Sequence, residues 1–329
     1  MLVRFFRTSF ATQYITAGLF ALAAWGAVLP HPPPMPEPSG PVILYSLLFR
    51  YLSATPVLAS LSGLVVVVIS ALWLNLLLTR HEIVPKSSSL VSFLFILLMC
   101  SHPDQMTLTP VNISVLLFLP LLKALLEAYN RQDPVDLTFS AGFIISFSAL
   151  FYLPSFLYYG FLLTAFLVYR SVKWREWAGS FIGLITPALF LAAWWFWTDR
   201  LPEMAAQYAA CFSKMTFSNP WQTADRLIPA IFILVFVLAG MSYNFNHLSE
   251  RTVETRKKLI LLSWLMIWTA ATFPFAGSLL FIHPELAFPA LAPFLSNVYL
   301  SRKKPFRWEL LLWAFIFTIA ANLALNLMN

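Results

Sequence analysis

Basic residues interrupt a chain that is otherwise a succession of apolar runs, and nearly all of them fall in alternate turns between those runs. Only Arg50, Arg200, Lys214 and Arg226 fall in the other set of turns. A run of about 20 apolar residues can cross a bilayer as a helix. Because cytoplasmic loops carry an excess of Lys and Arg, we expect the base-rich turns to face the cytoplasm. The base-poor turns then face the opposite side, called the outer face below.

The composition excludes a water-soluble globule. Hydrophobic residues make up 60% of the chain and charged residues 11%, whereas an ordinary soluble domain has roughly 25% charged residues. The formal net charge of +7 then reflects topology and an affinity for anionic lipid headgroups, not for nucleic acid. Membrane lipids are the expected partners.

The predicted fold class is an all-α, polytopic membrane protein with its N-terminus in the cytoplasm. We expect about eleven transmembrane helices, so the C-terminus would lie outside. No linker or change in composition divides the chain, which indicates a single transmembrane domain over residues 1–329. The expected spans are 11–29, 57–79, 88–101, 110–129, 137–153, 155–170, 178–197, 227–245, 258–277, 284–300 and 308–327.

The pair 137–153 and 155–170 is shorter than standard spans. One continuous helix there would be about 50 Å long at 1.5 Å per residue, more than a membrane needs. Pro154 cannot continue a regular helix, so we expect two helices that turn at Leu153-Pro154-Ser155.

Two segments of the outer face are predicted to be helices that lie in the membrane interface. The first, Val42 to Ala54, follows a Pro-rich connection. The second lies within the loop 198–226. Its apolar stripe consists of Met204, Tyr208, Cys211, Phe212 and Met215. Cys100 and Cys211 are also expected on this face, as unpaired thiols or, less favoured, as a disulfide.

Three histidines on the outer face are each followed by proline, and two of these pairs are followed by an acid. The motifs are His31-Pro32, His102-Pro103-Asp104 and His283-Pro284-Glu285. If the fold gathers them, Asp104 and Glu285 are candidate catalytic acids or bases, and His102 and His283 are candidate ligands of a divalent metal. The alternative is structural, since proline and polar residues also end helices at a membrane surface. The cofactor is otherwise unknown.

Motifs of soluble enzymes are missing. The chain has no phosphate-binding GxxxxGK[ST] or GxGxxG, and no GxSxG or HExxH. The predicted cytoplasmic loops are too short for a nucleotide-binding domain.

The stretch from Asn75 to Pro187 resembles an uncharacterised polytopic inner-membrane protein family of Bacteroidetes-type bacteria. The resemblance is carried by Pro85-Lys86-Ser87-Ser88, Leu150-Phe151-Tyr152-Leu153-Pro154-Ser155 and Trp174-Arg175-Glu176-Trp177, with Arg307-Trp308-Glu309 near the end. It implies a multi-pass protein of the bacterial inner membrane, with its outer face in the periplasm.

The architecture is also similar to that of GT-C membrane glycosyltransferases, which use polyprenyl-phosphate sugars at the periplasmic face. That likeness implies an acid in the first outer loop as base or metal ligand, and Glu37 is the only acid there. Asp104 would be a second acidic site. Arg50, Arg200 or Arg226 would contact the lipid phosphate.

Three functions follow as hypotheses. The first is a non-catalytic subunit or assembly factor of a cell-envelope complex, with other membrane-protein subunits as partners. The second is a GT-C-like glycosyltransferase, and the third a transporter of a lipid or lipid-linked substrate. An outward cavity that holds Glu37, Asp104 or Glu285 beside an arginine would favour the enzyme. A filled bundle with an apolar lateral groove would favour the subunit.

Overall fold

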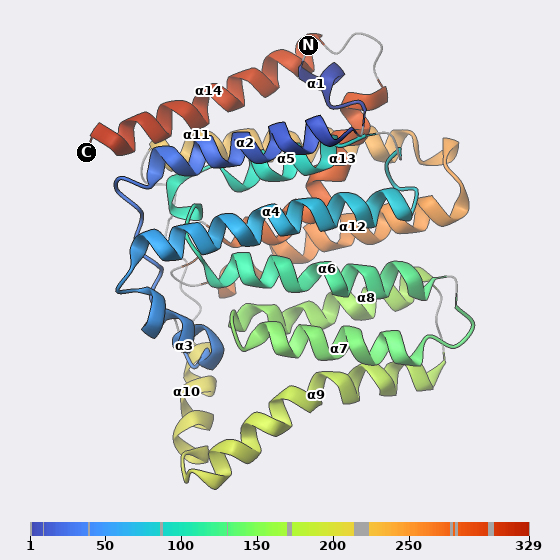
Figure 1. The fold of residues 1–329 in the computed structure, drawn as a ribbon. Helices are drawn as coiled ribbons and strands as arrows, with labels where there is room; N and C mark the ends of the chain where they lie inside the picture. The colour runs from blue at the N-terminus through green and yellow to red at the C-terminus, as the bar shows by residue number, and fades with distance from the viewer. Residues whose placement is uncertain are drawn as a thin grey trace.

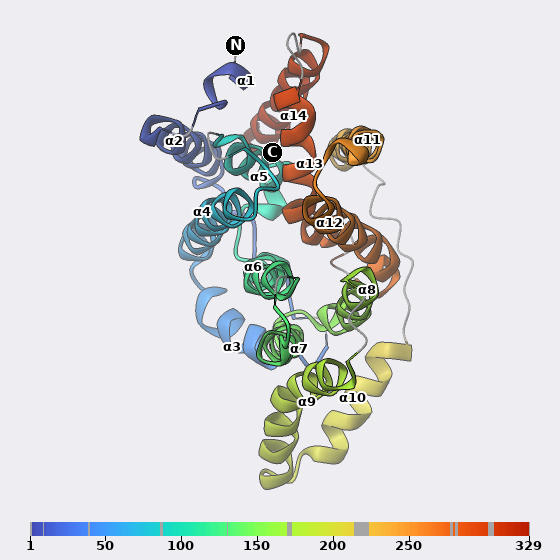
Figure 2. The ribbon, with the colours of Figure 1, turned by 90° about the vertical axis from the view of Figure 1, so that its right-hand side faces the viewer.

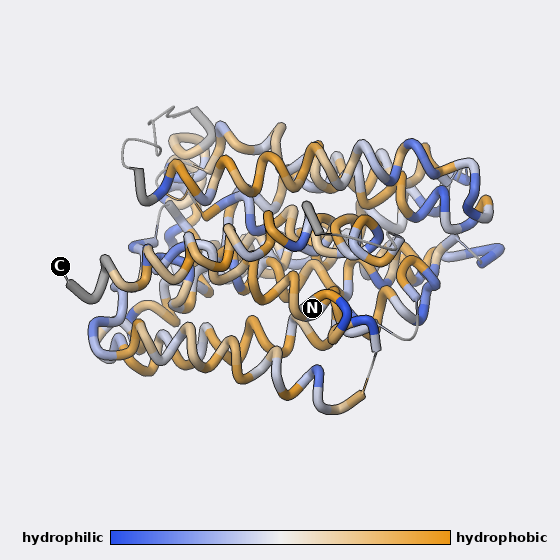
Figure 3. The backbone as a smooth tube through the Cα atoms, turned by 90° about the horizontal axis from the view of Figure 1, so that it is seen from above, coloured by the Kyte–Doolittle hydropathy of each residue, from blue (hydrophilic) through white to orange (hydrophobic). Residues whose placement is uncertain are grey.

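The computed structural model describes residues 2–8, 10–38, 40–85, 88–129, 131–169, 173–213, 224–276, 279, 282–301 and 306–328. Within these residues every regular element is a helix, which confirms the all-α prediction. The longer helices lie side by side with roughly parallel axes (Figure 1). Apolar residues dominate the middle of the helices, and hydrophilic residues gather towards their ends (Figure 3).

The elements follow one another along the chain with short connections. The α-helices are α1 (Leu2–Phe5), α2 (Ala11–Val28), α3 (Ile43–Leu52), α4 (Pro56–Arg80), α5 (Leu90–Met99), α6 (Pro110–Ala128), α7 (Val135–Ala149), α8 (Tyr159–Tyr169), α9 (Trp174–Trp197), α10 (Leu201–Ser213), α11 (Ala224–Asn246), α12 (Val253–Thr272), α13 (Phe288–Ser301) and α14 (Phe306–Met328). The 3-10 turns are η1 (Pro103–Gln105), η2 (Leu153–Tyr158), η3 (Leu248–Glu250), η4 (Phe273–Phe275) and η6 (His283–Ala287).

Six helices in the described part of the chain are long and apolar enough to cross a membrane: α2, α4, α6, α9, α11 and α12. This supports a multi-pass membrane protein. Most of the other predicted spans coincide with helices that are shorter. Of these, α5 has ten residues and α13 has fourteen.

The short helices α5 and α13 form the centre of the molecule. Every residue of α5 is buried, and so is nearly every residue of α13. A helix that is apolar on all sides is stable only when other helices surround it. The two pack against each other, with α4 beside α5 and α11 beside α13. α5 and α13 are therefore core helices that other helices surround.

The predicted turn between two short helices at Pro154 is confirmed. α7 ends at Ala149, and η2 begins at Leu153 with Pro154 in its first turn. Proline is accepted there because the first N–H groups of a helix have no partner within it. The turn places Tyr152 in the protein interior.

Helices form at both predicted interfacial segments. In α10 the expected stripe residues Met204, Tyr208 and Cys211 are the half-buried ones, and the Tyr208 hydroxyl donates to the Pro41 carbonyl at 2.9 Å. The Phe212 side chain, Met215 and Lys214 lie outside what the structure describes. In α3 the most buried side chain is Tyr45. Cys100 and Cys211 are free thiols, as the favoured interpretation predicted.

Helix α9 meets α7 through glycines. A Cβ atom at Gly183 would lie 2.1 Å from the Phe139 carbonyl oxygen, and one at Gly142 would lie 2.0 Å from that of Ser180. Only glycine permits so close an approach, as at other small-residue helix contacts in membranes. α9 and α10 project from the rest of the molecule (Figure 2).

Several bases predicted to be cytoplasmic are paired with acids. Arg131 lies 2.7 Å from Asp136, and Lys258 is buried beside Glu254. A hydrogen bond from Lys173, with its charge, lowers the pKa of exposed Asp133. The bases Lys86, Arg170 and Arg302 to Lys304 lie outside the described residues.

Candidate functional site

The turn at His102 holds an ion pair close to the surface. The His102 Nδ1 atom accepts from the Asp104 backbone N–H at 3.2 Å and thereby caps η1. The Asp104 carboxylate then lies 2.9 Å from Nη2 of Arg226 and 3.4 Å from the His102 Nδ1. Both members of the Asp104–Arg226 pair are 39% exposed. η1 and the start of α11 thus present both charges at one place.

The turn at His283 is enclosed. Its Nδ1 lies 2.6 Å from the Tyr152 hydroxyl, and its Nε2 lies 3.0 Å from both the Thr272 hydroxyl and the Thr269 carbonyl oxygen. Because a carbonyl oxygen only accepts, Nε2 carries the proton and Nδ1 accepts from Tyr152. Burial lowers the pKa of His283 to about 4, so the ring is neutral.

Glu285 is the most unusual group in this turn. It is fully buried, and neither carboxyl oxygen has a hydrogen-bond partner among the residues that the structure describes. η6 lies between α12 and α13, outside both helices. Burial raises the pKa of Glu285 well above its usual range, because an unpaired buried carboxylate is costly. The side chain is therefore a neutral acid.

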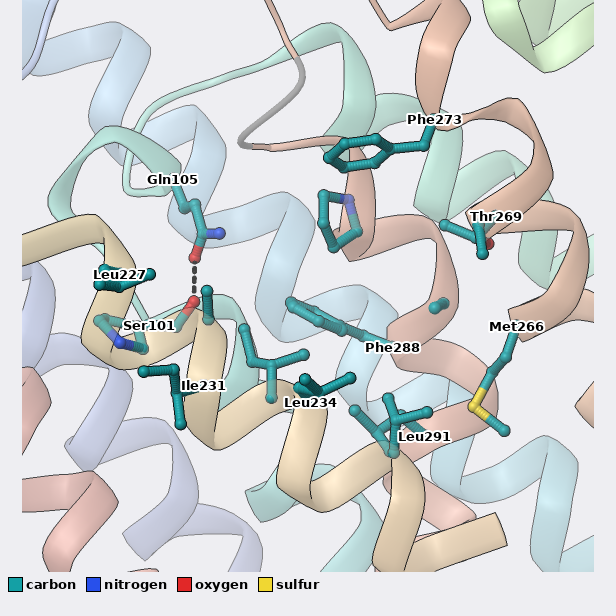
Figure 4. Close-up of a pocket in the computed structure, with 17 residues that line it drawn as sticks. Ser101, Gln105, Leu227, Ile231, Leu234, Met266, Thr269, Phe273, Phe288 and Leu291 are labelled. Carbon is teal, nitrogen blue, oxygen red and sulfur yellow. Dashed lines mark hydrogen bonds between the residues drawn. The ribbon is translucent and has the colours of Figure 1, made fainter. Parts of the chain in front are cut away.

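A cavity of about 440 Å³ joins the two turns, within the usual size range of small-molecule sites, about 300–1,000 Å³. Figure 4 shows Ser101 and Gln105 beside Leu227, with Met266 and Leu291 across the cavity. Its lining is almost wholly apolar and comes from α11, α12, η4, η6 and α13. Few polar groups line the cavity, and two of them bond to each other: the Ser101 hydroxyl donates to Oε1 of Gln105 at 2.6 Å.

The cavity is lined by residues that are next in sequence to the candidate functional residues of each turn. Gln105 follows Asp104, and Leu227 follows Arg226, so the ion pair flanks one end of the apolar space. Pro284, which lies between His283 and Glu285 in the sequence, is part of the cavity wall. The cavity thus lies beside both turns that have the His-Pro-acid sequence, but none of His102, Asp104, His283 and Glu285 lines it.

The remaining candidates lie elsewhere. His31 is exposed at the end of α2, and Glu37 is exposed in the Pro-rich connection. Arg50 is exposed on α3, and Arg200 lies at the corner between α9 and α10. None of these four lines the cavity.

The geometry offers no ready metal site at the two histidines. No group of three or more His, Cys, Asp or Glu side chains in the described ranges is placed to hold a metal ion. Both ring nitrogens of His283 are engaged in hydrogen bonds. His102 Nδ1 accepts the backbone N–H of its own turn. The histidines instead act as structural hydrogen-bonding groups.

Sequence reasoning missed the residues that hold His283. Thr269 and Thr272 lie three residues apart within an apolar helix, and that spacing places two polar groups on one helical face. This pattern could have pointed to a buried polar partner. Tyr152 lies two residues before Pro154, within a motif that looked only structural.

Residues 40–328, most of the chain, match a protein family described as a family of unknown function, DUF6427. This agrees with the expected resemblance to an uncharacterised family. No curated protein and no solved structure matches the chain. The Bacteroidetes-type source and the GT-C likeness stay predictions.

Proposed function

We propose that this chain, which belongs to the DUF6427 family, binds a phosphate-bearing lipid at the outer face of a bacterial inner membrane. The observation that supports the proposal is the combination of an apolar cavity with the Arg226–Asp104 pair at its end. A lipid has the same combination, with an apolar chain joined to a charged headgroup.

The two parts of the site have complementary roles. The lining from α11, α12 and α13 would bury an acyl or prenyl chain, and each buried methylene contributes about 0.8 kcal/mol. Arg226 would bind the phosphate. A guanidinium has five N–H donors in a planar fork, so it can hold the Asp104 carboxylate and a phosphate together. Asp104 would orient the fork in that arrangement.

In the topology that we propose, the site faces the periplasm. We propose that α5, α7, α8, α13 and α14 cross the membrane together with the six helices named above. The eleven crossings of the sequence prediction would result. The base-rich turns then lie in the cytoplasm, and η1, η6, α3 and α10 lie at the periplasmic face.

A glycosyltransferase is the second candidate, and the partial exposure of Asp104 beside Arg226 favours it. Asp104 would accept the proton of an acceptor hydroxyl while the sugar leaves the lipid phosphate held by Arg226. Exposed Glu37 would have no part in this site. The envelope-complex subunit of the sequence analysis stays a prediction, since a bound lipid suits a subunit as well.

Lipid affinity tests the first proposal. Native mass spectrometry would compare dioleoyl phosphatidic acid with dioleoylglycerol, which lacks the phosphate. We expect the wild type to prefer the phosphatidic acid at least about tenfold, equivalent to about 1.4 kcal/mol. Arg226→Gln should lose this preference. Arg50→Gln, on exposed α3, is the matched control and should keep it. Equal preference in wild type and Arg226→Gln would refute the proposal.

The transferase needs its own assay. Membranes that contain the protein would receive a radiolabelled polyprenyl-phosphate sugar, and transfer to endogenous acceptors would be counted. Asp104→Asn should abolish transfer while retaining the phosphatidic acid preference. Transfer that survives this substitution would remove Asp104 as the base.

A further inference from the structure

The corner between α9 and α10 has an unusual helix end. The Arg200 N–H donates to the Trp195 carbonyl at 2.9 Å, and the Asp199 N–H donates to the Phe196 carbonyl at 3.2 Å. This is the Schellman arrangement, in which the residue after the helix adopts a left-handed conformation and is usually glycine. Here that residue is Asp199, with φ of 54°. Asp199 thus has a backbone conformation in which glycine would be less strained.

Asp199 and Arg200 line a surface hollow of about 730 Å³. Its other walls include Trp194, Trp195 and Trp197, and Ile43 of α3. Both charged side chains are exposed, and neither has an ion-pair partner in the part of the chain that the structure describes. Tryptophan is the residue typical of the headgroup level of a membrane. The hollow therefore offers one positive and one negative group at that level.

An apolar pocket adjoins the hollow. It has a volume of about 260 Å³ and lies between α7, η2, α9 and α10. Trp195 lines both spaces, and its ring packs against Tyr208 with centroids 5.6 Å apart. Leu150, Leu153 and Leu191 are among the other lining residues. A molecule with a charged head and an apolar chain could occupy the two spaces together.

We propose that this corner binds a zwitterionic phospholipid with a primary amine, a phosphoethanolamine lipid. Arg200 binds the phosphate, Asp199 binds the ammonium group, and part of an acyl chain enters the pocket beside Leu191. The adjacent opposite charges select a zwitterionic headgroup, and the N–H donors of a primary ammonium, which a trimethylammonium lacks, can hydrogen-bond to the Asp199 carboxylate. An anionic lipid would bring no cation to Asp199, and an uncharged lipid would leave both side chains unpaired. The site is separate from the cavity at Arg226 and does not depend on its function.

Lipid preference in detergent tests this assignment. The purified chain would be titrated with dioleoyl phosphatidylethanolamine, phosphatidylglycerol and phosphatidylcholine, and the affinity of each would be measured by native mass spectrometry. We expect the wild type to bind phosphatidylethanolamine at least about fivefold more tightly than the other two. Equal affinities, or a preference for phosphatidylcholine or phosphatidylglycerol, would overturn the proposal.

The variants exploit the left-handed conformation of Asp199. Asp199→Gly removes the carboxylate and suits the positive φ, so the helix end is retained. Asp199→Asn keeps the shape and also tolerates this conformation. Both should lose the selectivity for phosphatidylethanolamine, and Arg200→Gln should weaken binding of all three phospholipids. Arg50→Gln, on exposed α3 and outside the lining of both spaces, is the control and should leave the selectivity unchanged. Selectivity retained in both Asp199 variants would overturn the assignment.

Discussion

The turns at His102 and His283 have the same sequence pattern, yet their surroundings are opposite. The acid of the first turn, Asp104, is part of a half-exposed ion pair with Arg226. The acid of the second turn, Glu285, is fully buried without a hydrogen-bond partner in the described residues. η6 is enclosed by α6, α12 and α13, whereas in the first turn, otherwise buried, the half-exposed Asp104 carboxylate meets Arg226 at the start of α11. The comparison shows that neighbouring helices, and not the motif, decide what each turn can do.

Replacing each histidine in turn with alanine should give the largest difference in stability between the two turns. His283→Ala leaves the buried Tyr152 hydroxyl without its His283 partner, whereas the Thr272 hydroxyl still donates to the Trp268 carbonyl. The orphaned phenol costs about 1–3 kcal/mol and the space left by the ring adds to this, so we expect a loss of about 2–5 kcal/mol in the free energy of unfolding. His102→Ala removes a cap and should cost about 0.5–2 kcal/mol. Thermal unfolding of both variants in detergent measures the difference. Equal losses would contradict the contrast between the turns.

The pH dependence of stability should sharpen the comparison next. Glu285 has a raised pKa in the fold, so its contribution is complete below its ordinary value of 4.5 and is lost as the pH rises. Glu285→Gln mimics the neutral acid and should gain stability over wild type above that pH. The slope is at most about 1.4 kcal/mol per pH unit.

The pKa shift of His283 makes stability depend on pH in the opposite direction, but His283 is present in both the wild type and Glu285→Gln. Its lowered pKa means that its contribution is present above 6.5 and is lost as the pH falls towards 4. The difference between Glu285→Gln and wild type therefore isolates Glu285. Melting temperatures measured from pH 5 to pH 8 would test it, and a constant difference would show that Glu285 is ionised in the fold as it is in the unfolded chain.

The ion pair should give the smallest effect on stability. Asp104→Asn removes the carboxylate charge beside Arg226 while keeping its shape. Because both partners are 39% exposed, we expect a cost of at most about 1 kcal/mol. The same measurement in high salt should reduce even this difference. A loss as large as that of His283→Ala would mean that the first turn is as enclosed as the second.

Much of the helical framework could be predicted from the sequence. Pro154 predicted the turn between α7 and α8, because proline interrupts a helix ladder. The spacing of Met204, Tyr208 and Cys211 predicted the half-buried face of α10. Both signals are local, so a single sequence contains them.

The site itself was less predictable because its contacts are distant in sequence. Asp104 and Arg226 are 122 positions apart, and Tyr152 and His283 are 131 positions apart. Periodicity identifies which face of a helix is apolar, but not which helix covers it. The burial of Glu285 and the cavity under α11 both depend on that packing.

The position of a bound lipid tests the central claim most directly. A phosphatidic acid with a photoreactive diazirine on its acyl chain would be bound to the purified chain and cross-linked by light. Mass spectrometry of the digested protein would then locate the attachment. We predict labels on cavity residues such as Ile231, Leu234, Met266 and Leu291, with reduced labelling in Arg226→Gln. Labels confined to the exposed outer surfaces of the helices, and equal in both proteins, would contradict the account.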